Sequence, residues 1–155
     1  MRFDNRDFDD YLSLQPLFDP ANDVYKVVLV GSNNGLVCLY YAYTKDPGSI
    51  HKLVIWNPSI RKLLLIPQPS PLFFSPSYEK LIGFGFDSRT DDYKLLLTRF
   101  SMNPIKDVVL YSLNSNSWKQ ITHVALNYTR GSNMPETTPA FVDGRFLWSV
   151  IADKG

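Results

Sequence analysis

One pair of strands occurs twice in this sequence, 55 residues apart, and this repeat limits the possible folds more than any other feature. Each copy is an apolar run, a polar turn and a second apolar run, which is the pattern of a β-hairpin. A unit that recurs at a fixed spacing predicts a repeat architecture. An irregular β-sandwich with coincidental spacing is the alternative, because sandwiches share the pattern of short strands. The matching positions are Trp56 and Tyr111, Leu63 and Trp118, and Ile66 and Ile121.

Turn-forming residues divide the first copy into four predicted strands. Asn34-Gly35 supplies the positive φ angles of a tight hairpin turn, so Gly35 has a structural role. Asn57 and Pro58 interrupt the apolar runs, because proline cannot donate to a strand ladder and pre-sets a turn. We predict strands at about 26–31, 36–43, 53–56 and 62–66.

The second copy follows the same plan, and a third unit opens near the C-terminus. Gly83 and Gly85 lie in the first apolar run, and a polar turn that ends at Asp92 leads into a run that begins at Tyr93. Gly144 marks a further hairpin turn. The predicted strands of the second copy are about 81–86, 93–100, 108–111 and 118–121.

These units predict an all-β fold. Four short strands per unit at a period of about 50 residues are typical of a kelch-like β-propeller. We expect about two full four-stranded blades and the start of a third in residues 24–155, after a polar, acidic N-terminal segment at residues 1–23. The chain is expected to be truncated at both ends relative to a closed propeller, which has four or more blades.

Charge and cysteine content exclude several classes of partner and cofactor. The chain has 16 basic and 15 acidic residues, so net charge favours neither nucleic acid nor a membrane surface. Its one cysteine, Cys38, cannot form an intramolecular disulfide, and we expect it to be a buried, inert thiol. No motif for a metal, a cofactor or a catalytic centre was found, which predicts a non-enzymatic protein. We expect it in the cytoplasm or the nucleus, since it has no secretory signal.

Most conspicuous residues have a sufficient structural explanation. The three tryptophans Trp56, Trp118 and Trp148 are predicted to anchor the core. The carboxylates Asp87, Asp91 and Asp92 are predicted to cap a turn, because the loop lacks the glycine and glutamate of a calcium site. The histidines His51 and His123 are predicted to lie at the surface, because neither has a second histidine at metal-binding spacing.

A series of ordered motifs resembles the F-box-associated, kelch-type domain of plant F-box proteins. The resemblance implies a substrate-recognition domain of a Skp–cullin–F-box ubiquitin ligase subunit, which binds a target protein for ubiquitination. No F-box is visible in residues 1–23, so a Skp-type adaptor is an expected partner only if an F-box lies upstream. The motifs lie at residues 31–39, 55–62, 83–87, 91–94, 109–113, 116–119 and 141–148.

Binding specificity is expected in the loops, where sequence varies on a rigid scaffold. Aromatic, arginine and methionine side chains are enriched at protein interfaces. The loops at 68–78, 101–106 and 127–138 are therefore candidates for target binding. The alternatives are that these loops tuck under the blade or are linkers. The candidate contact residues are Phe73, Phe74, Tyr78, Tyr128, Arg130 and Met134.

Two other functions are compatible with the sequence. One is a carbohydrate-binding, lectin-like propeller, in which a sugar would stack on Phe74 or Tyr128. The other is a remnant without a ligase role, whose open strand edges and uncovered apolar faces would cause self-association.

Overall fold

The computed structural model describes residues 23–45, 47–74, 79–100, 105–121, 140–142 and 145–147. These residues form ten strands and one short 3-10 helix, which confirms the all-β prediction. The chain divides into two compact units, Met1–Gln68 and Pro69–Gly155. Each unit contains one sheet, and the two are described in turn.

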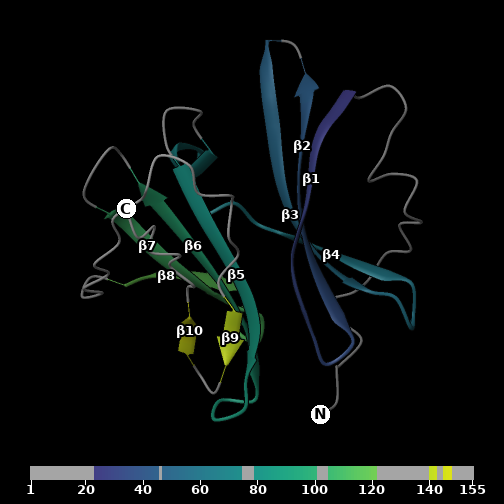
Figure 1. Cartoon of the computed structure of the whole chain (residues 1–155), viewed down its shortest axis with the longest axis vertical. Coiled ribbons are helices and arrows are strands. Elements are labelled where there is room, and N and C mark those ends of the chain that lie inside the picture. Colours follow the sequence, from purple (N-terminus) through teal and green to yellow (C-terminus); the bar gives the residue numbers. More distant parts are fainter. Residues whose placement is uncertain are drawn as a thin grey trace, which may run out of the picture. The chain divides into compact units, whose positions relative to one another are not determined.

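The first unit is a four-stranded antiparallel sheet with the simplest order, β1-β2-β3-β4 (Figure 1). A two-residue turn joins β1 to β2, and both of its residues have positive φ, 46° at Asn34 and 81° at Gly35. This backbone matches a type I′ turn, as the Asn-Gly pair predicts. The strands are β1 (Asp23–Asn33), β2 (Leu36–Lys45), β3 (Gly48–Asn57) and β4 (Lys62–Ile66).

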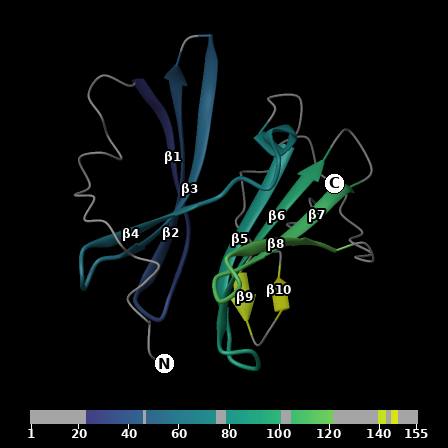
Figure 2. The same cartoon turned by 180° about the vertical axis from the view of Figure 1, so that it is seen from behind.

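The second unit is a six-stranded sheet of order β10-β9-β5-β6-β7-β8. Its β5–β8 portion is an antiparallel four-stranded unit like the first sheet. The β9–β10 hairpin lies at the β5 edge, where Phe84 pairs with Ala140 in parallel (Figure 2). The elements are η1 (Pro71–Phe74), β5 (Glu79–Asp87), β6 (Asp92–Phe100), β7 (Ile105–Ser112), β8 (Ser117–Gln120), β9 (Ala140–Val142) and β10 (Arg145–Leu147).

The hairpin predicted around Gly144 is present as β9 and β10, although Gly144 itself is outside the described residues. Its strands join the second sheet and do not form a sheet of their own.

The strand repeat is confirmed at the level of individual pairs. Trp56 pairs with Leu63 across β3 and β4, and Tyr111 pairs with Trp118 across β7 and β8. The third repeat position also agrees: Leu53 pairs with Ile66, and the Ile121 amide donates to the Val108 carbonyl at 2.9 Å. The 55-residue offset therefore superposes the register of β3 and β4 on that of β7 and β8.

Tyrosines, and not the predicted tryptophans, are the fully buried aromatic anchors. Tyr93 and Tyr111 are the largest side chains with essentially no exposed surface. Trp56 and Trp118 are half-buried: Trp56 packs against the cluster of Tyr41, Val54 and Leu63, and the Trp118 ring lies 5.3 Å from the Tyr111 ring, so both pack at the margin of the core. Trp118 lies on β8, the last strand of its sheet, where a neighbour covers one side only. Trp148 lies outside the described residues.

Candidate interaction surfaces

Three four-residue turns share one design. The residue before two of the turns accepts a hydrogen bond from the backbone two residues later: Ser59 N–H donates to Asn57 Oδ1, and Arg89 N–H donates to Asp87 Oδ1, both at 3.1 Å. This Asx geometry is the reason that Asn and Asp favour turns. The last residue of each turn is left-handed, with φ of 54° at Arg61, 48° at Asp91 and 48° at Asn116. The turns cover residues 58–61, 88–91 and 113–116.

Asp87 orders the turn that follows β5. Besides the Arg89 amide, its carboxylate accepts a hydrogen bond from Thr90 Oγ1 at 3.0 Å and pairs with the Arg89 guanidinium at 3.4 Å. Burial alone would raise the pKa of Asp87, but the hydrogen bonds from Thr90 and Arg89 outweigh it and lower the pKa. The carboxylate is therefore charged and fixed in place at neutral pH.

Asp92 joins this turn to the next one. The residue is 2% exposed, and its carboxylate accepts hydrogen bonds from Ser112 Oγ at 2.5 Å and from the Asn114 amide at 2.9 Å. Lys94 Nζ completes the set as an ion pair. Asn114 Nδ2 in turn donates to the Asp91 carbonyl at 3.1 Å. One buried carboxylate thus fixes the β5–β6 and β7–β8 turns to each other.

These contacts define a rigid, polar edge that we call the turn end of the second sheet, residues 88–91 and 113–116. Apart from the buried Leu113, its side chains are exposed, and most are hydroxyls or amides. The turn end of the first sheet, residues 34–35 and 58–61, is exposed too and includes Ile60 at 44% exposure. The prediction that the Asp87–Asp92 cluster caps a turn is confirmed for Asp87 and Asp92.

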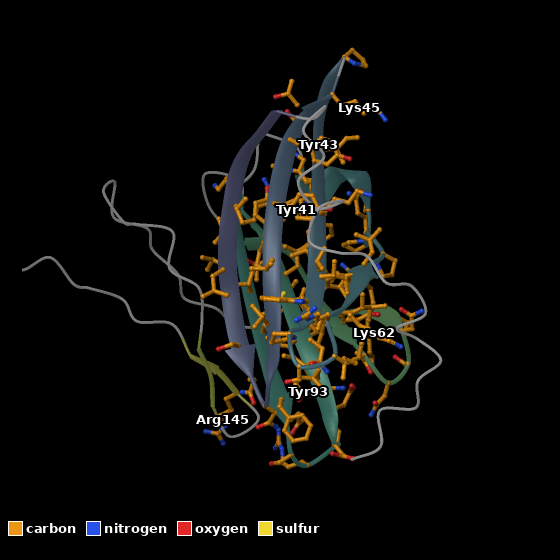
Figure 3. The ribbon with its side chains drawn as sticks, turned by 90° about the vertical axis from the view of Figure 1, so that its right-hand side faces the viewer. Tyr41, Tyr43, Lys45, Lys62, Tyr93 and Arg145 are labelled. Carbon is orange, nitrogen blue, oxygen red and sulfur yellow. The ribbon has the colours of Figure 1, made fainter. Side chains whose placement is uncertain are left out.

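The second exposed region is one face of the first sheet. Residues that pair across antiparallel strands share a face, so the register assigns each side chain to a side. On this side Tyr41, Val54 and Leu63 form a packed cluster, with Tyr43 and Trp56 against it. Tyr41, Tyr43 and Lys45 follow one another along β2 (Figure 3). We call this side the open face: Val27, Leu29, Ser32, Val37, Leu39, Tyr41, Tyr43, Lys45, Ile50, Lys52, Val54, Trp56, Leu63 and Leu65.

Two of the predicted contact residues are not accessible. Phe73 and Phe74 lie in η1 and are buried, and the Arg99 guanidinium lies 5.5 Å from the centre of the Phe73 ring. The expectation that this pair is exposed for binding is therefore wrong, because η1 folds their rings into the protein. Burial also removes Phe74 as a sugar-stacking platform. The other predicted contacts, Tyr78, Tyr128, Arg130 and Met134, lie outside the described residues.

His51 and Cys38 are both more integrated than surface residues. His51 was predicted to lie at the surface, but it is half-buried, and its Nδ1 lies 2.7 Å from the Tyr40 hydroxyl. Its carbonyl also accepts a hydrogen bond from Gln68. Cys38 is fully buried as predicted, and burial raises the pKa of its thiol. A raised pKa makes the thiolate, and so reactivity, inaccessible in the folded state.

The glycines and the proline named from the sequence lie in the predicted structural positions. Gly83 and Gly85 are buried in β5, opposite Leu96 and Lys94. Pro58 is exposed at the start of its turn. His123 lies outside the described residues.

Within the described part of the chain, no three His, Cys, Asp or Glu side chains gather as metal ligands. No helix in that part has the length and hydropathy needed to cross a membrane.

The repeated four-stranded antiparallel unit matches the blade of a β-propeller domain. Comparison with known families gives the particular family: residues 3–154 match the F-box associated beta propeller domain, and the chain belongs to that family. It is thus a partial, kelch-like propeller and a protein-interaction module of the kind found in F-box proteins.

Curated relatives from Arabidopsis thaliana agree with this assignment. The chain is 31% identical to F-box/kelch-repeat protein At3g23880 over 140 residues, which are 86% of this chain and 34% of the relative. It is 29% identical to F-box protein CPR1 over 137 residues, which are 81% of this chain and 32% of the relative. The chain therefore spans about a third of the length of these relatives. No solved structure matches it.

Proposed function

We propose that this chain is part of the target-binding domain of a Skp–cullin–F-box ubiquitin ligase subunit. The observation that carries the proposal is the family match over residues 3–154, together with relatives that are F-box proteins. In this role the chain holds a target protein while partner subunits perform the ubiquitin transfer. A Skp-type adaptor then binds an F-box elsewhere in the assembled protein, and the chain acts in the cytoplasm or the nucleus.

The turn ends of the two sheets are the best-supported target contacts among the described residues. Their backbones are fixed by Asn57, Asp87 and Asp92, so binding a target does not require ordering a loop. Their exposed side chains offer hydrogen-bond donors and acceptors, and Arg61 and Arg89 offer charge. A rigid edge with varied polar side chains is a chemically suitable recognition surface.

The first experiment tests the ligase role. An antibody against residues 127–138 is used to precipitate the endogenous protein, and its mass and bound adaptor are measured. A species well above 17.8 kDa that carries a Skp-type adaptor supports the proposal. A 17.8 kDa species without the adaptor contradicts it.

A second experiment tests the turn ends as target contacts. Arg61→Glu and Arg89→Glu reverse charges on the two turn ends. Lys119→Glu is the matched control, because Lys119 is also exposed but lies on β8, outside the turns. Mass spectrometry of proteins captured by the full-length protein measures the result. We expect the turn variants to lose target recovery and the control to retain it. Equal recovery by all three would remove the turn ends as contacts.

A further inference from the structure

The turn between β5 and β6 carries one hydroxyl that the fold does not use. Ser88 is exposed, and its hydroxyl makes no hydrogen bond within the described part of the chain. The neighbouring hydroxyls are engaged. Thr90 Oγ1 donates to Asp87 Oδ2 at 3.0 Å, and the Ser115 and Ser117 hydroxyls lie 2.8 Å apart. Ser88 can therefore be modified without loss of a structural contact.

The exposure of this turn does not depend on what covers the faces of the sheet. The turn lies at the end of the β5–β6 hairpin (Figure 1). Blades of a propeller pack face to face, so the ends of their strands stay exposed when a neighbouring blade is added. The fold does not require a serine here either, because the equivalent β1–β2 hairpin turns through Asn34-Gly35.

The sequence around Ser88 supplies a charge pattern that a kinase can read. Ser88 is the only serine or threonine of the 155-residue chain that is followed three positions later by a carboxylate, that of Asp91. Asp91 is exposed at the end of the same turn, and its carboxylate makes no hydrogen bond with the described residues. A carboxylate at this spacing is the feature by which acidophilic protein kinases select a serine, through complementary charge.

We propose that Ser88 is a phosphorylation site for an acidophilic protein kinase and that its phosphate regulates the turn end of the second sheet. Ser88 Oγ attacks the γ-phosphorus of ATP. The new oxygen–phosphorus bond forms as the bond to the bridging oxygen breaks, ADP leaves, and the hydroxyl proton passes to a base of the kinase. The regulatory part rests on the proposed function, in which this turn end contacts a target.

The phosphate changes the charge of the turn end from balanced to negative. Arg89 and Asp91 are its charged side chains, one of each sign. A phosphoserine adds a charge of about −1.5 to −2 at neutral pH. A target that recognises the unmodified edge through Arg89 would therefore meet a surface of reversed charge.

Arg89 is the cation placed to pair with this phosphate. Its side chain is 67% exposed, and its guanidinium lies 3.4 Å from Asp87 Oδ1, which is long for a charged hydrogen bond. A phosphate on the adjacent residue offers three acceptor oxygens and more charge than one carboxylate, so it competes for the guanidinium. Asp87 keeps the Arg89 amide and the Thr90 hydroxyl as donors. The turn thus stays folded while the Arg89 side chain is withdrawn from the target.

The site is tested on the 155-residue chain with ATP and a purified acidophilic kinase of the casein-kinase class. We expect a mass increase of about 80 Da, one phosphoryl group, mapped to Ser88 by fragmentation mass spectrometry. Ser88→Ala should abolish the transfer, and Asp91→Asn should slow it severalfold because the kinase loses its charge determinant. Ser115→Ala is the matched control and should keep the full rate, since Ser115 is an exposed serine of the same turn end with no carboxylate three positions later.

Thermal unfolding shows that these variants remain folded. Their melting temperatures should match that of the parent chain, because the Ser88 hydroxyl and the Asp91 carboxylate hold no described contact. Absence of phosphate at Ser88 would overturn the proposal. A transfer rate that Asp91→Asn leaves unchanged would also overturn it, because the turn would then lack the recognition feature.

The regulatory effect has a readout that needs no target. The NMR resonance of Arg89 Nε–H should shift on phosphorylation as the guanidinium moves from Asp87 to the phosphate. An unchanged resonance would overturn the pairing.

Target recovery is then compared for the full-length protein before and after phosphorylation, with Ser88→Ala treated in the same way as the control. We expect severalfold lower recovery by the phosphorylated protein and no change in the control. Equal recovery by both would overturn the regulation. Failure of the proposed function is distinguishable, because it appears as absence of target from the untreated protein while the phosphate transfer and the Arg89 shift persist.

Discussion

The two sheets share one register but differ in how much of the equivalent face is exposed to solvent. Leu29 and Ile82 are opposite Leu39 and Leu97, which match in the repeat, yet Leu29 is 59% exposed and Ile82 is 8% exposed. The difference shows that strand pattern sets which side of a blade is apolar. Whether that side is buried from solvent depends on what packs against it.

The sheets also order their turns differently. The first sheet relies on backbone conformation, with Asn34-Gly35 in one turn and the neutral cap Asn57 in the other. The second sheet uses carboxylates, with Asp87 capping one turn and Asp92 joining two. Turns held by a glycine or a neutral amide have no ionisable group. The stability of turns held by a carboxylate depends on its ionisation and on its buried partners.

The largest expected difference in the free energy of unfolding is between substitutions at equivalent positions of the two sheets. Tyr111→Ala should lower the free energy of unfolding by about 3–5 kcal/mol, because it empties a fully buried aromatic site. It also removes the hydrogen bond from the Tyr111 hydroxyl to Asn116. Trp56→Ala should cost about half as much, since Trp56 is half-buried. Urea unfolding, followed by tryptophan fluorescence and Cys38 labelling, measures both, and equal losses of stability would contradict the distinction.

The carboxylate that joins two turns should be the next most sensitive site. Asp92→Asn should cost about 2–3 kcal/mol, because Lys94 and Ser112 lose a charged acceptor in a buried site. Asp91→Asn is the control, since Asp91 is exposed and Asn tolerates its left-handed backbone. Thermal unfolding of the pair checks the expectation, and similar melting temperatures would show that the Asp92 network contributes little.

Two glycines in the first sheet isolate the effect of backbone strain, because an added Cβ is not crowded at either position. A Cβ at Gly35 or at Gly48 meets no atom within 4 Å, but only Gly35 is shown with a positive φ, at 81°. Gly35→Ala should therefore cost about 1–2 kcal/mol, and Gly48→Ala should be neutral or slightly stabilising. Chemical denaturation distinguishes the two; a neutral Gly35→Ala would show that the turn can change type.

A smaller stabilisation is expected at a left-handed residue that is not glycine. Arg61 has a φ of 54°, so Arg61→Gly should raise the free energy of unfolding by about 0.5–1 kcal/mol. Lys62→Gly, at the first position of β4, should lower it by a similar amount, because glycine weakens a strand. Melting curves of both variants measure the sign. Destabilisation by Arg61→Gly would reveal a side-chain role for Arg61 that outweighs the strain.

Low pH should destabilise the Asp87 turn of the second sheet and leave the similarly capped Asn57 turn of the first sheet unchanged. The pKa of Asp87 is lower folded than unfolded, so its contribution to stability is present above the unfolded pKa and is lost as pH falls below about 4. NMR exchange of the Arg89 amide, which donates to Asp87, should accelerate over that range relative to its intrinsic rate. The Ser59 amide, which donates to neutral Asn57, is the control and should show no such step.

Sequence reasoning was accurate where local chemistry determines the outcome. The Asn34-Gly35 turn, the Asp87 cap and the 55-residue register follow from residue types at short range or from matched spacing. It was inaccurate where exposure matters. Phe73 and Phe74 follow a proline in a predicted loop, and nothing local shows that a short helix buries both rings.

The turn ends and the open face were only partly visible in the sequence. Asp92 was recognised as a turn residue, but its contacts with Ser112 and Asn114 join positions 20 and 22 residues away. The open face was less visible still, because apolar residues on both sides of a strand look alike in a linear pattern. A comparison of Val27 with Lys80, and of Leu65 with Gln120, would have revealed it, but it requires the strand register.

The sequence by itself determined the all-β class, the repeat, the turn positions and the alternation of each strand, since these depend on backbone preferences and on spacing along the chain. The tertiary structure alone decided which aromatic rings are buried, which carboxylate joins two turns and which side of the first sheet stays exposed. These features depend on contacts between strands distant in sequence, and the free energy of burial is set by such contacts.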